Sequence, residues 1–113
     1  MINRVIAVYP GRFQPMGRHH KATYDWMVSN FGAENSFIVT SDKVVLPDSP
    51  FSFDEKSRIA QAYGIPATAI KNERVVYAPT RYGFLSGENP MTTAVVVVVG
   101  QKDLQDSFDP KTG

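Results

Sequence analysis

The chain has 113 residues, a length that predicts a single domain with a small hydrophobic core. Hydrophobic residues make up 42% and charged residues 20%, as in ordinary globular proteins, and a net charge of +1 argues against a general nucleic-acid or membrane surface. The absence of cysteine excludes disulfides, thiolate catalysis and cysteine-based zinc sites. The N-terminus lacks a signal-peptide h-region and no apolar run reaches membrane-spanning length, so we expect a cytoplasmic protein.

The first half of the chain alternates between apolar and helical patterns. Residues 4–9 predict a strand whose continuous apolar character indicates burial on both faces, as in a parallel sheet. A turn over 10–17 leads into a predicted helix over 18–31, and Gly32 is a natural stop for that helix. A second strand is predicted over 37–40.

A second helix is predicted after a loop that covers residues 41–52. Ser52 is a candidate N-cap, and Glu55 lies three residues later, which is the spacing of a capping box. The helix is expected to run to about Tyr63 and to end at Gly64.

Two further strands are predicted in the remaining part of the chain. Residues 66–70 are expected to form a short helical turn, and residues 75–78 a third strand. An irregular loop is predicted over 79–93. For residues 80–90 within it, a disordered connector is the simpler interpretation and contact with a ligand the alternative. The valine-rich run over 94–99 has the length of a buried strand.

The alternation predicts an α/β fold, a Rossmann-like parallel sheet of about four or five strands with flanking helices. We assign residues 1–104 to this domain and residues 105–113 to a polar tail. Because ligands of such folds bind at the carboxyl ends of the strands, the turns at 10–17 and Gly100–Asp103 are expected to share the binding edge.

The segment Pro10–Lys21 carries the strongest chemical signal in the sequence. It reads Pro-Gly-Arg-Phe-Gln-Pro-Met-Gly-Arg-His-His-Lys and joins a strand, a turn and the start of a helix. The first N–H groups of a helix lack intrahelical partners and attract anions, which predicts a phosphate site. The basic residues of the segment are Arg12, Arg18, His19, His20 and Lys21.

The loop Gly11–Pro15 resembles the phosphate-binding loop of archaeal-type nicotinamide-mononucleotide adenylyltransferases, members of the nucleotidylyltransferase superfamily, which also reads Gly-Arg-Phe-Gln-Pro. That family continues with a His-x-Gly-His signature at the start of the first helix. Here the signature position reads Gly17-Arg18-His19-His20, so only His20 stays in register.

The resemblance extends along most of the chain. Ser49–Lys56 matches the place of a second family element that reads roughly Asn-Pro-Phe-Thr-Ala-Gly-Glu-Arg, and Gly100–Asp103 is similar to a Gly-x-x-Asp strand end. The family then has a further strand and an Ile-Ser-x-Thr-like turn, and no such sequence follows Asp103. We therefore expect a truncated form, or one whose remainder is supplied by another molecule.

The resemblance implies an enzyme that transfers a nucleotidyl group from ATP or CTP to a small phosphorylated acceptor and releases pyrophosphate. The loop favours nicotinamide mononucleotide as the acceptor. Mg²⁺ would arrive with the triphosphate, held mostly by its oxygens and water. A non-catalytic nucleotide-binding module is the alternative. A third interpretation is a homo-oligomer that uses an exposed sheet edge.

The resemblance gives catalytic roles to His20 and Arg12, because phosphate chemistry of this kind depends on positioning and charge neutralisation. The nucleotide-binding residues that it implies are Gly11, Arg12, Phe13, Gln14, Gly17, His19, His20, Gly100 and Asp103. No metal site is expected from the two histidines, because neighbours on a helix point about 100° apart.

Most of these residues have a structural alternative. His20 would otherwise cap the helix or lie at the edge of the core, and His19 either crowds the base or replaces the missing histidine. Phe13 is expected to pack beneath the loop, whereas Gln14 would hydrogen-bond the acceptor or hold the turn. Asp103 would bind a ribose hydroxyl or cap a helix.

Overall fold

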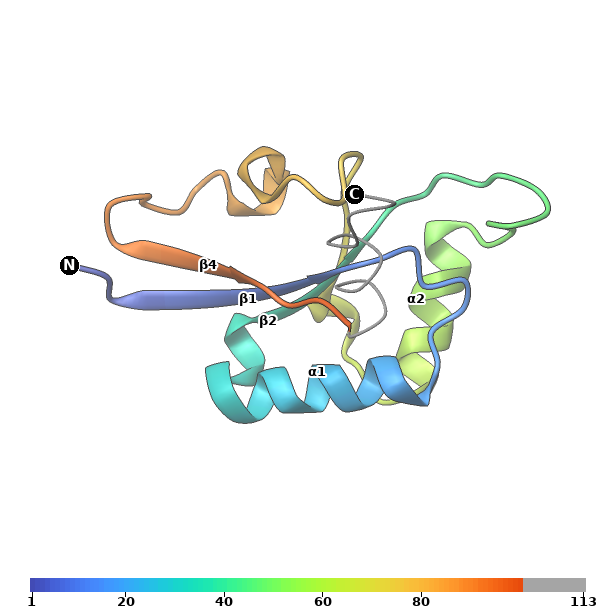
Figure 1. Ribbon diagram of the computed structural model, residues 1–113, viewed down its shortest axis with the longest axis horizontal. Helices are drawn as coiled ribbons and strands as arrows, with labels where there is room; N and C mark the ends of the chain where they lie inside the picture. Colours follow the sequence, from blue (N-terminus) through green and yellow to red (C-terminus); the bar gives the residue numbers. More distant parts are fainter. Residues whose placement is uncertain (101–113) are drawn as a thin grey trace, which may run out of the picture.

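The computed structural model describes residues 1–100, which form a four-stranded parallel sheet with two helices packed against it (Figure 1). The strands lie in the order β3-β2-β1-β4. Their bounds are β1 (Arg4–Pro10), β2 (Ser36–Thr40), β3 (Ile70–Asn72) and β4 (Thr93–Val97). The helices are α1 (Arg18–Phe31) and α2 (Phe53–Ala62). The predicted Rossmann-like α/β fold is therefore confirmed.

Strand β1 lies in the interior of the sheet and organises both of its faces. It pairs with β2 on one side, where Ala7 lies opposite Ser36, and with β4 on the other, where Ala7 lies opposite Val96. Residues 6–9 are at most 2% exposed. The continuous apolar run thus marks a strand that is buried on both faces, as predicted.

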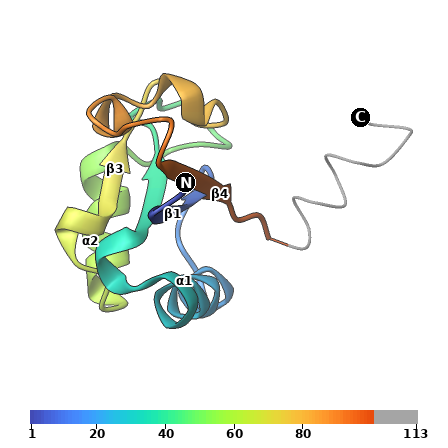
Figure 2. The ribbon, with the colours of Figure 1, turned by 90° about the vertical axis from the view of Figure 1, so that its left-hand side faces the viewer.

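Each face of the sheet has its own apolar cluster. Helix α1 covers the face that carries Ala7, Tyr9 and Ile38, and Met27 of that helix is fully buried there. The opposite face is covered by the segment 79–85, which lies across the sheet from α1 (Figure 2). Both faces of the sheet are thus covered by apolar side chains.

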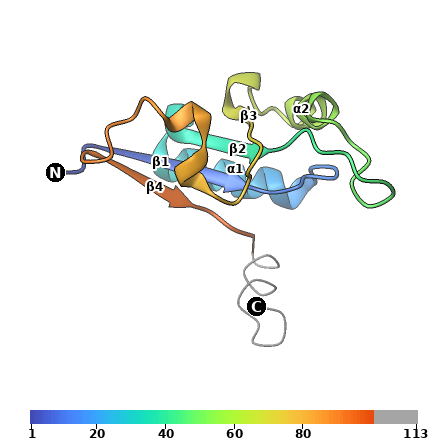
Figure 3. The ribbon, with the colours of Figure 1, turned by 90° about the horizontal axis from the view of Figure 1, so that it is seen from above.

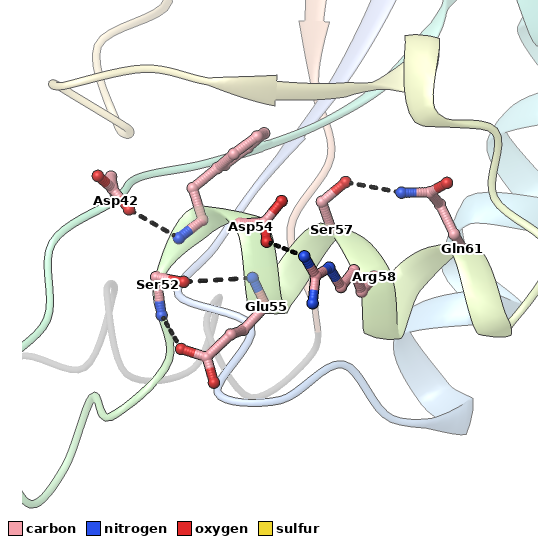
Figure 4. Close-up of polar contacts among 8 residues, drawn as sticks. Asp42, Ser52, Asp54, Glu55, Ser57, Arg58 and Gln61 are labelled. Carbon is pink, nitrogen blue, oxygen red and sulfur yellow. Dashed lines mark hydrogen bonds and ion pairs between the residues drawn. The ribbon is translucent and has the colours of Figure 1, made fainter.

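The starts and ends of both helices follow local sequence signals. Helix α1 ends at Gly32, whose φ of 90° favours glycine and whose N–H donates to the Val28 carbonyl at 2.9 Å. Helix α2 begins with the predicted capping box, in which Ser52 and Glu55 bond each other's backbone N–H groups (Figure 4). Both helix predictions are confirmed.

The third strand is at a different place from the one predicted. The prediction of a strand over 75–78 is wrong, because the structure places β3 at Ile70–Asn72, directly after a short 3₁₀ helix at Ala67–Ala69. That 3₁₀ helix confirms the short helical turn expected over 66–70. Beyond β3, the Glu73 carboxylate bonds backbone N–H groups of the segment 79–85, so the chain leaves the sheet there.

The expectation of a disordered connector over 80–90 is also wrong. Two 3₁₀ helices, Pro79–Arg81 and Gly83–Leu85, hold Tyr82 against the sheet with 3% of its surface exposed. The Tyr82 hydroxyl donates to the Val76 carbonyl. The loop is ordered because one aromatic side chain supplies both burial and a hydrogen bond.

Strand β4 is an edge strand, and the expectation that its valine run is buried is wrong. Val95, Val96 and Val97 are 39%, 36% and 45% exposed, since the described chain supplies no strand beyond β4. A homo-oligomer that pairs through this edge stays a prediction, which concentration-dependent light scattering would test.

Among residues 1–100, no helix has the length and apolar character needed to cross a membrane.

Tyr82→Phe is expected to lower the free energy of unfolding by an amount that becomes smaller at alkaline pH. Burial, followed by the charges of Glu73 and Tyr77, raises the pKa of Tyr82 to about 12. Because the unfolded phenol ionises near pH 10, the contribution of the neutral group is complete below pH 10 and is lost towards pH 12. Unfolding in urea should show wild type more stable than Tyr82→Phe at pH 8, with the difference shrinking between pH 10 and 12. A constant difference would contradict the burial of a neutral phenol.

Candidate anion-binding site

A pocket of about 520 Å³ lies at the carboxyl edge of the sheet, and segments that follow β1, β2 and β3 form its walls. This is the edge at which open α/β sheets bind ligands, and its volume is in the usual range for small organic molecules. The residues that line it are Gly11, Arg12, Gln14, Ser41, Lys43, Val45, Asp48, Ser49, Lys56, Arg74, Val75, Val76 and Tyr77. The lining thus has four cationic side chains and one carboxylate.

Arg12 enters the pocket from the loop after β1 and is held there by the loop over 41–52. Its Nε donates to Ser49 Oγ at 3.0 Å, and Nη2 donates to Ser49 Oγ and to the Asp48 carbonyl, the latter at 3.1 Å. Three of the five guanidinium N–H groups are used in this way. The Nη1 group makes no hydrogen bond within residues 1–100 and can donate to an anion.

Lys56 is the second cation of the pocket and is only 3% exposed. Its Nζ donates to Thr40 Oγ1 at 3.2 Å and to the Ser41 carbonyl at 2.9 Å. Burial lowers the pKa of Lys56 and the nearby charge of Arg12 lowers it further, while Asp42 raises it. One N–H of the Lys56 ammonium has no acceptor within residues 1–100. A bound anion would accept this hydrogen bond and would offset the repulsion between Lys56 and Arg12.

The first turn of α2 brings Lys56 to this position. Asp42 Oδ1 accepts the Phe53 N–H at 2.9 Å, which fastens the start of α2 to the segment that follows β2 (Figure 4). The capping box of Ser52 and Glu55 satisfies two further backbone groups at the same end. Lys56 is one turn further along and therefore reaches the end of β2.

Lys43 and Arg74 contribute the two remaining cations, and both are exposed. The ion pairs within residues 1–100 are Arg4–Glu88, Lys21–Asp25 and Arg58–Asp54, and none of them involves a residue that lines the pocket. The positive charge of the pocket is therefore not neutralised by ion pairs within the described chain.

Three of the residues expected from the phosphate loop line the pocket, namely Gly11, Arg12 and Gln14. Gln14 bonds the backbone of Phe51 in both directions, accepting its N–H at 2.9 Å and donating to its carbonyl at 3.4 Å. Gln14 was expected either to hydrogen-bond the acceptor or to hold the turn, and these two hydrogen bonds to Phe51 correspond to the second role.

Phe13 packs beneath the loop, as expected, with 6% of its surface exposed and a φ of 48°. Its ring makes edge contacts with Tyr9 at 5.2 Å and with His20 at 5.0 Å between centroids. A Cβ at Gly11 would lie 3.0 Å from this ring, so the glycine permits the packing. The loop Gly11–Pro15 thus packs on the rings of Phe13, Tyr9 and His20.

The two histidines and Gly17 do not line the pocket. His20 Nδ1 accepts the Gly17 N–H at 2.8 Å, and the ring of His19 lies 3.8 Å from that of His20. Of the roles considered for His20, this contact is that of a helix cap. Gly100 follows β4. Residues 101–104 of the assigned domain, which include Asp103, lie outside the described residues, as does the tail over 105–113.

Sequence reasoning singled out neither Lys56 nor Ser49 as a site residue. A signal for Lys56 was present, because it occupies the last position of the Ser49–Lys56 element, where the resembled family has arginine. No group of three or more His, Asp or Glu side chains that could hold a metal occurs among residues 1–100. A cation would therefore have to bring most of its own ligands to this pocket.

The structure is that of a small α/β protein with a cation-lined pocket at the carboxyl edge of its sheet. No protein-family model, no curated protein and no solved structure matches the chain.

His20→Ala is expected to lower the free energy of unfolding by about 1 kcal/mol, because the Gly17 N–H loses its acceptor. His19→Ala, which removes an exposed neighbour without this bond, is the matched control and should cost less. Thermal unfolding of both variants measures the difference. Equal losses would contradict the capping role, and a ten-fold loss of ATP affinity in His20→Ala alone would favour direct contact with the ligand.

Proposed function

We propose that this chain binds a nucleoside triphosphate and transfers its nucleotidyl group to a small phosphorylated acceptor. The donor would be ATP or CTP, and nicotinamide mononucleotide is the acceptor that the loop Gly11–Pro15 favours. The observation that supports this best is that Arg12 and the buried Lys56 line the same pocket, where neither forms an ion pair within residues 1–100.

The proposed reaction needs charge neutralisation more than acid–base chemistry. A phosphate oxygen of the acceptor attacks the α-phosphorus of the donor, and the bond from that phosphorus to the bridging oxygen breaks as pyrophosphate leaves. Arg12 Nη1 and the third N–H of Lys56 are the donors left over to meet phosphate oxygens. Mg²⁺ bound to the triphosphate would supply further neutralisation, held mostly by phosphate oxygens and water.

The other residues of the pocket support these two cations. Ser49 and the Asp48 carbonyl fix the guanidinium of Arg12, and Gln14 keeps the loop over 41–52 against the phosphate loop. Thr40 and Ser41 orient the Lys56 ammonium. Such preorganisation reduces the entropy that is lost when phosphate binds.

Isothermal titration with ATP and with CTP in Mg²⁺ tests binding, and pyrophosphate release in the presence of nicotinamide mononucleotide tests transfer. Arg12→Ala is expected to weaken the binding of the donor about ten-fold or more. Arg81→Ala removes the same charge outside the pocket and is the control. Failure of both nucleotides to bind would overturn the proposal.

A non-catalytic nucleotide-binding module is the second candidate, and the geometry of His20 favours it. The side chain that the resemblance makes catalytic is bonded to Gly17 and packed on Phe13, away from the pocket. Saturable binding of ATP or CTP without pyrophosphate release, whatever the acceptor, is the result that this candidate predicts.

A further inference from the structure

We propose that Lys43 and Arg74 form a second anion subsite in the same pocket, so that the pocket takes a small organic molecule with two separated phosphate groups. This inference rests on the proposed function, in that one phosphate group occupies the space between Arg12 and Lys56. The second group would lie between the two exposed cations, whose chain segments follow β2 and β3.

The charges of the pocket exceed what a single phosphate group requires. Arg12 and Lys56 already carry two positive charges, which match the charge of one phosphate. Lys43 and Arg74 add two more, and the side chains of both lack a hydrogen-bond or ion-pair partner within residues 1–100. The single carboxylate of the lining, Asp48, leaves a net charge of +3.

The two cation pairs differ in their surroundings. The Lys56 ammonium is buried and bonded to the end of β2, whereas Lys43 and Arg74 are exposed on the two loops that flank the pocket (Figure 3 shows these loops leaving β2 and β3). A group bound by Arg12 and Lys56 is met by donors that hydrogen bonds hold in place, although only Lys56 is buried. A group bound by the exposed pair is met by long, adaptable side chains.

Apolar side chains line the pocket together with the cations. Val45 comes from the same loop as Lys43, and Val75, Val76 and Tyr77 follow Arg74 directly in the chain. The Tyr77 side chain is largely exposed, with a relative accessibility of 67%. A flat heterocycle or a sugar between two phosphate groups would cover these surfaces, whereas a bare inorganic anion would leave them in water.

Two adenine nucleotides that differ by one phosphate group test the proposal. AMP carries a single phosphate, and adenosine 3′,5′-bisphosphate carries a second one on the far side of the ribose. Titration calorimetry at low ionic strength should find the bisphosphate bound about ten-fold more tightly by the wild-type chain. Lys43→Ala and Arg74→Ala should each weaken the bisphosphate about three- to ten-fold and change AMP binding less than two-fold.

Arg81→Ala is the matched control, because it removes one exposed positive charge outside the pocket lining. Equal affinity for the two nucleotides, or a loss in Arg81→Ala as large as in Arg74→Ala, would overturn the second subsite. If AMP still binds and Lys56→Met abolishes that binding, the proposed function survives such a result. If neither nucleotide binds, the second subsite is overturned, and the titration with ATP and CTP decides the proposed function separately.

Discussion

Lys56→Met is expected to lower the affinity for ATP by about 10- to 100-fold while leaving the fold as stable as before, or more so. The affinity falls because a charge-assisted hydrogen bond to phosphate contributes about 1.5–3 kcal/mol. The stability does not fall, because a buried ammonium without a carboxylate partner is costly and methionine fills a similar volume. Calorimetric titration with ATP and urea unfolding measure the two effects on the same variant.

The pH dependence of the wild-type chain provides an independent check on Lys56. Because burial and Arg12 lower the pKa of this group in the folded state, the unfolded chain holds the proton more tightly. The stability contribution of Lys56 should therefore rise with pH from the lowered pKa towards 10.5, while phosphate affinity falls over the same range. Lys56→Arg, whose guanidinium stays charged, should show neither change. A variant Lys56→Met that binds ATP normally would contradict the role of this side chain.

Met27→Ala is expected to lower the free energy of unfolding by about 3 kcal/mol. Met27 is fully buried between α1 and the sheet, in the cluster that contains Tyr9 and Ile38. Truncation removes apolar contacts and leaves a cavity that the surrounding strands fill only in part. For a domain of this size, such a loss corresponds to a fall in melting temperature of more than 10 °C.

Trp26→Ala is the matched control for this prediction. Trp26 is the preceding residue in α1, and its side chain is 53% exposed and in edge contact with Phe31 at 5.9 Å. Although tryptophan is the larger side chain, its removal should cost less than the removal of Met27. The opposite order would show that α1 presents a different face to the sheet.

The elements that follow from local chemistry could be predicted, and those that depend on distant contacts could not. Helix α1 has the predicted limits, because an amphipathic repeat and Gly32 define it locally. Residues 75–77 are β-branched or aromatic, yet the predicted strand over 75–78 does not form. The Tyr82 hydroxyl donates to the Val76 carbonyl, and the Glu73 carboxylate accepts the Gly83 N–H. These contacts join residues six and ten positions apart, and no local sequence pattern reveals them.

The candidate site shows the same division. The loop Gly11–Pro15 could be singled out from the sequence because it is contiguous, and the structure places Gly11, Arg12 and Gln14 in the lining of the pocket. The burial of Lys56 could not be predicted from the sequence, because lysine is almost always exposed. It results from the approach of α2 to the end of β2. The clamp of Ser49 on Arg12 joins residues 37 positions apart, and its effect on the guanidinium could not be read from either residue.

The position of β1 between β2 and β4 has a consequence for synthesis on the ribosome. Arg4 of β1 pairs with Thr93 of β4, which is 89 residues later in the chain. Strand β1 is therefore synthesised well before its partner β4. At about 5–20 residues per second, this interval is roughly 5–20 s. During that time β1 can pair with β2 alone, and its other edge offers apolar residues to chaperones and neighbouring nascent chains.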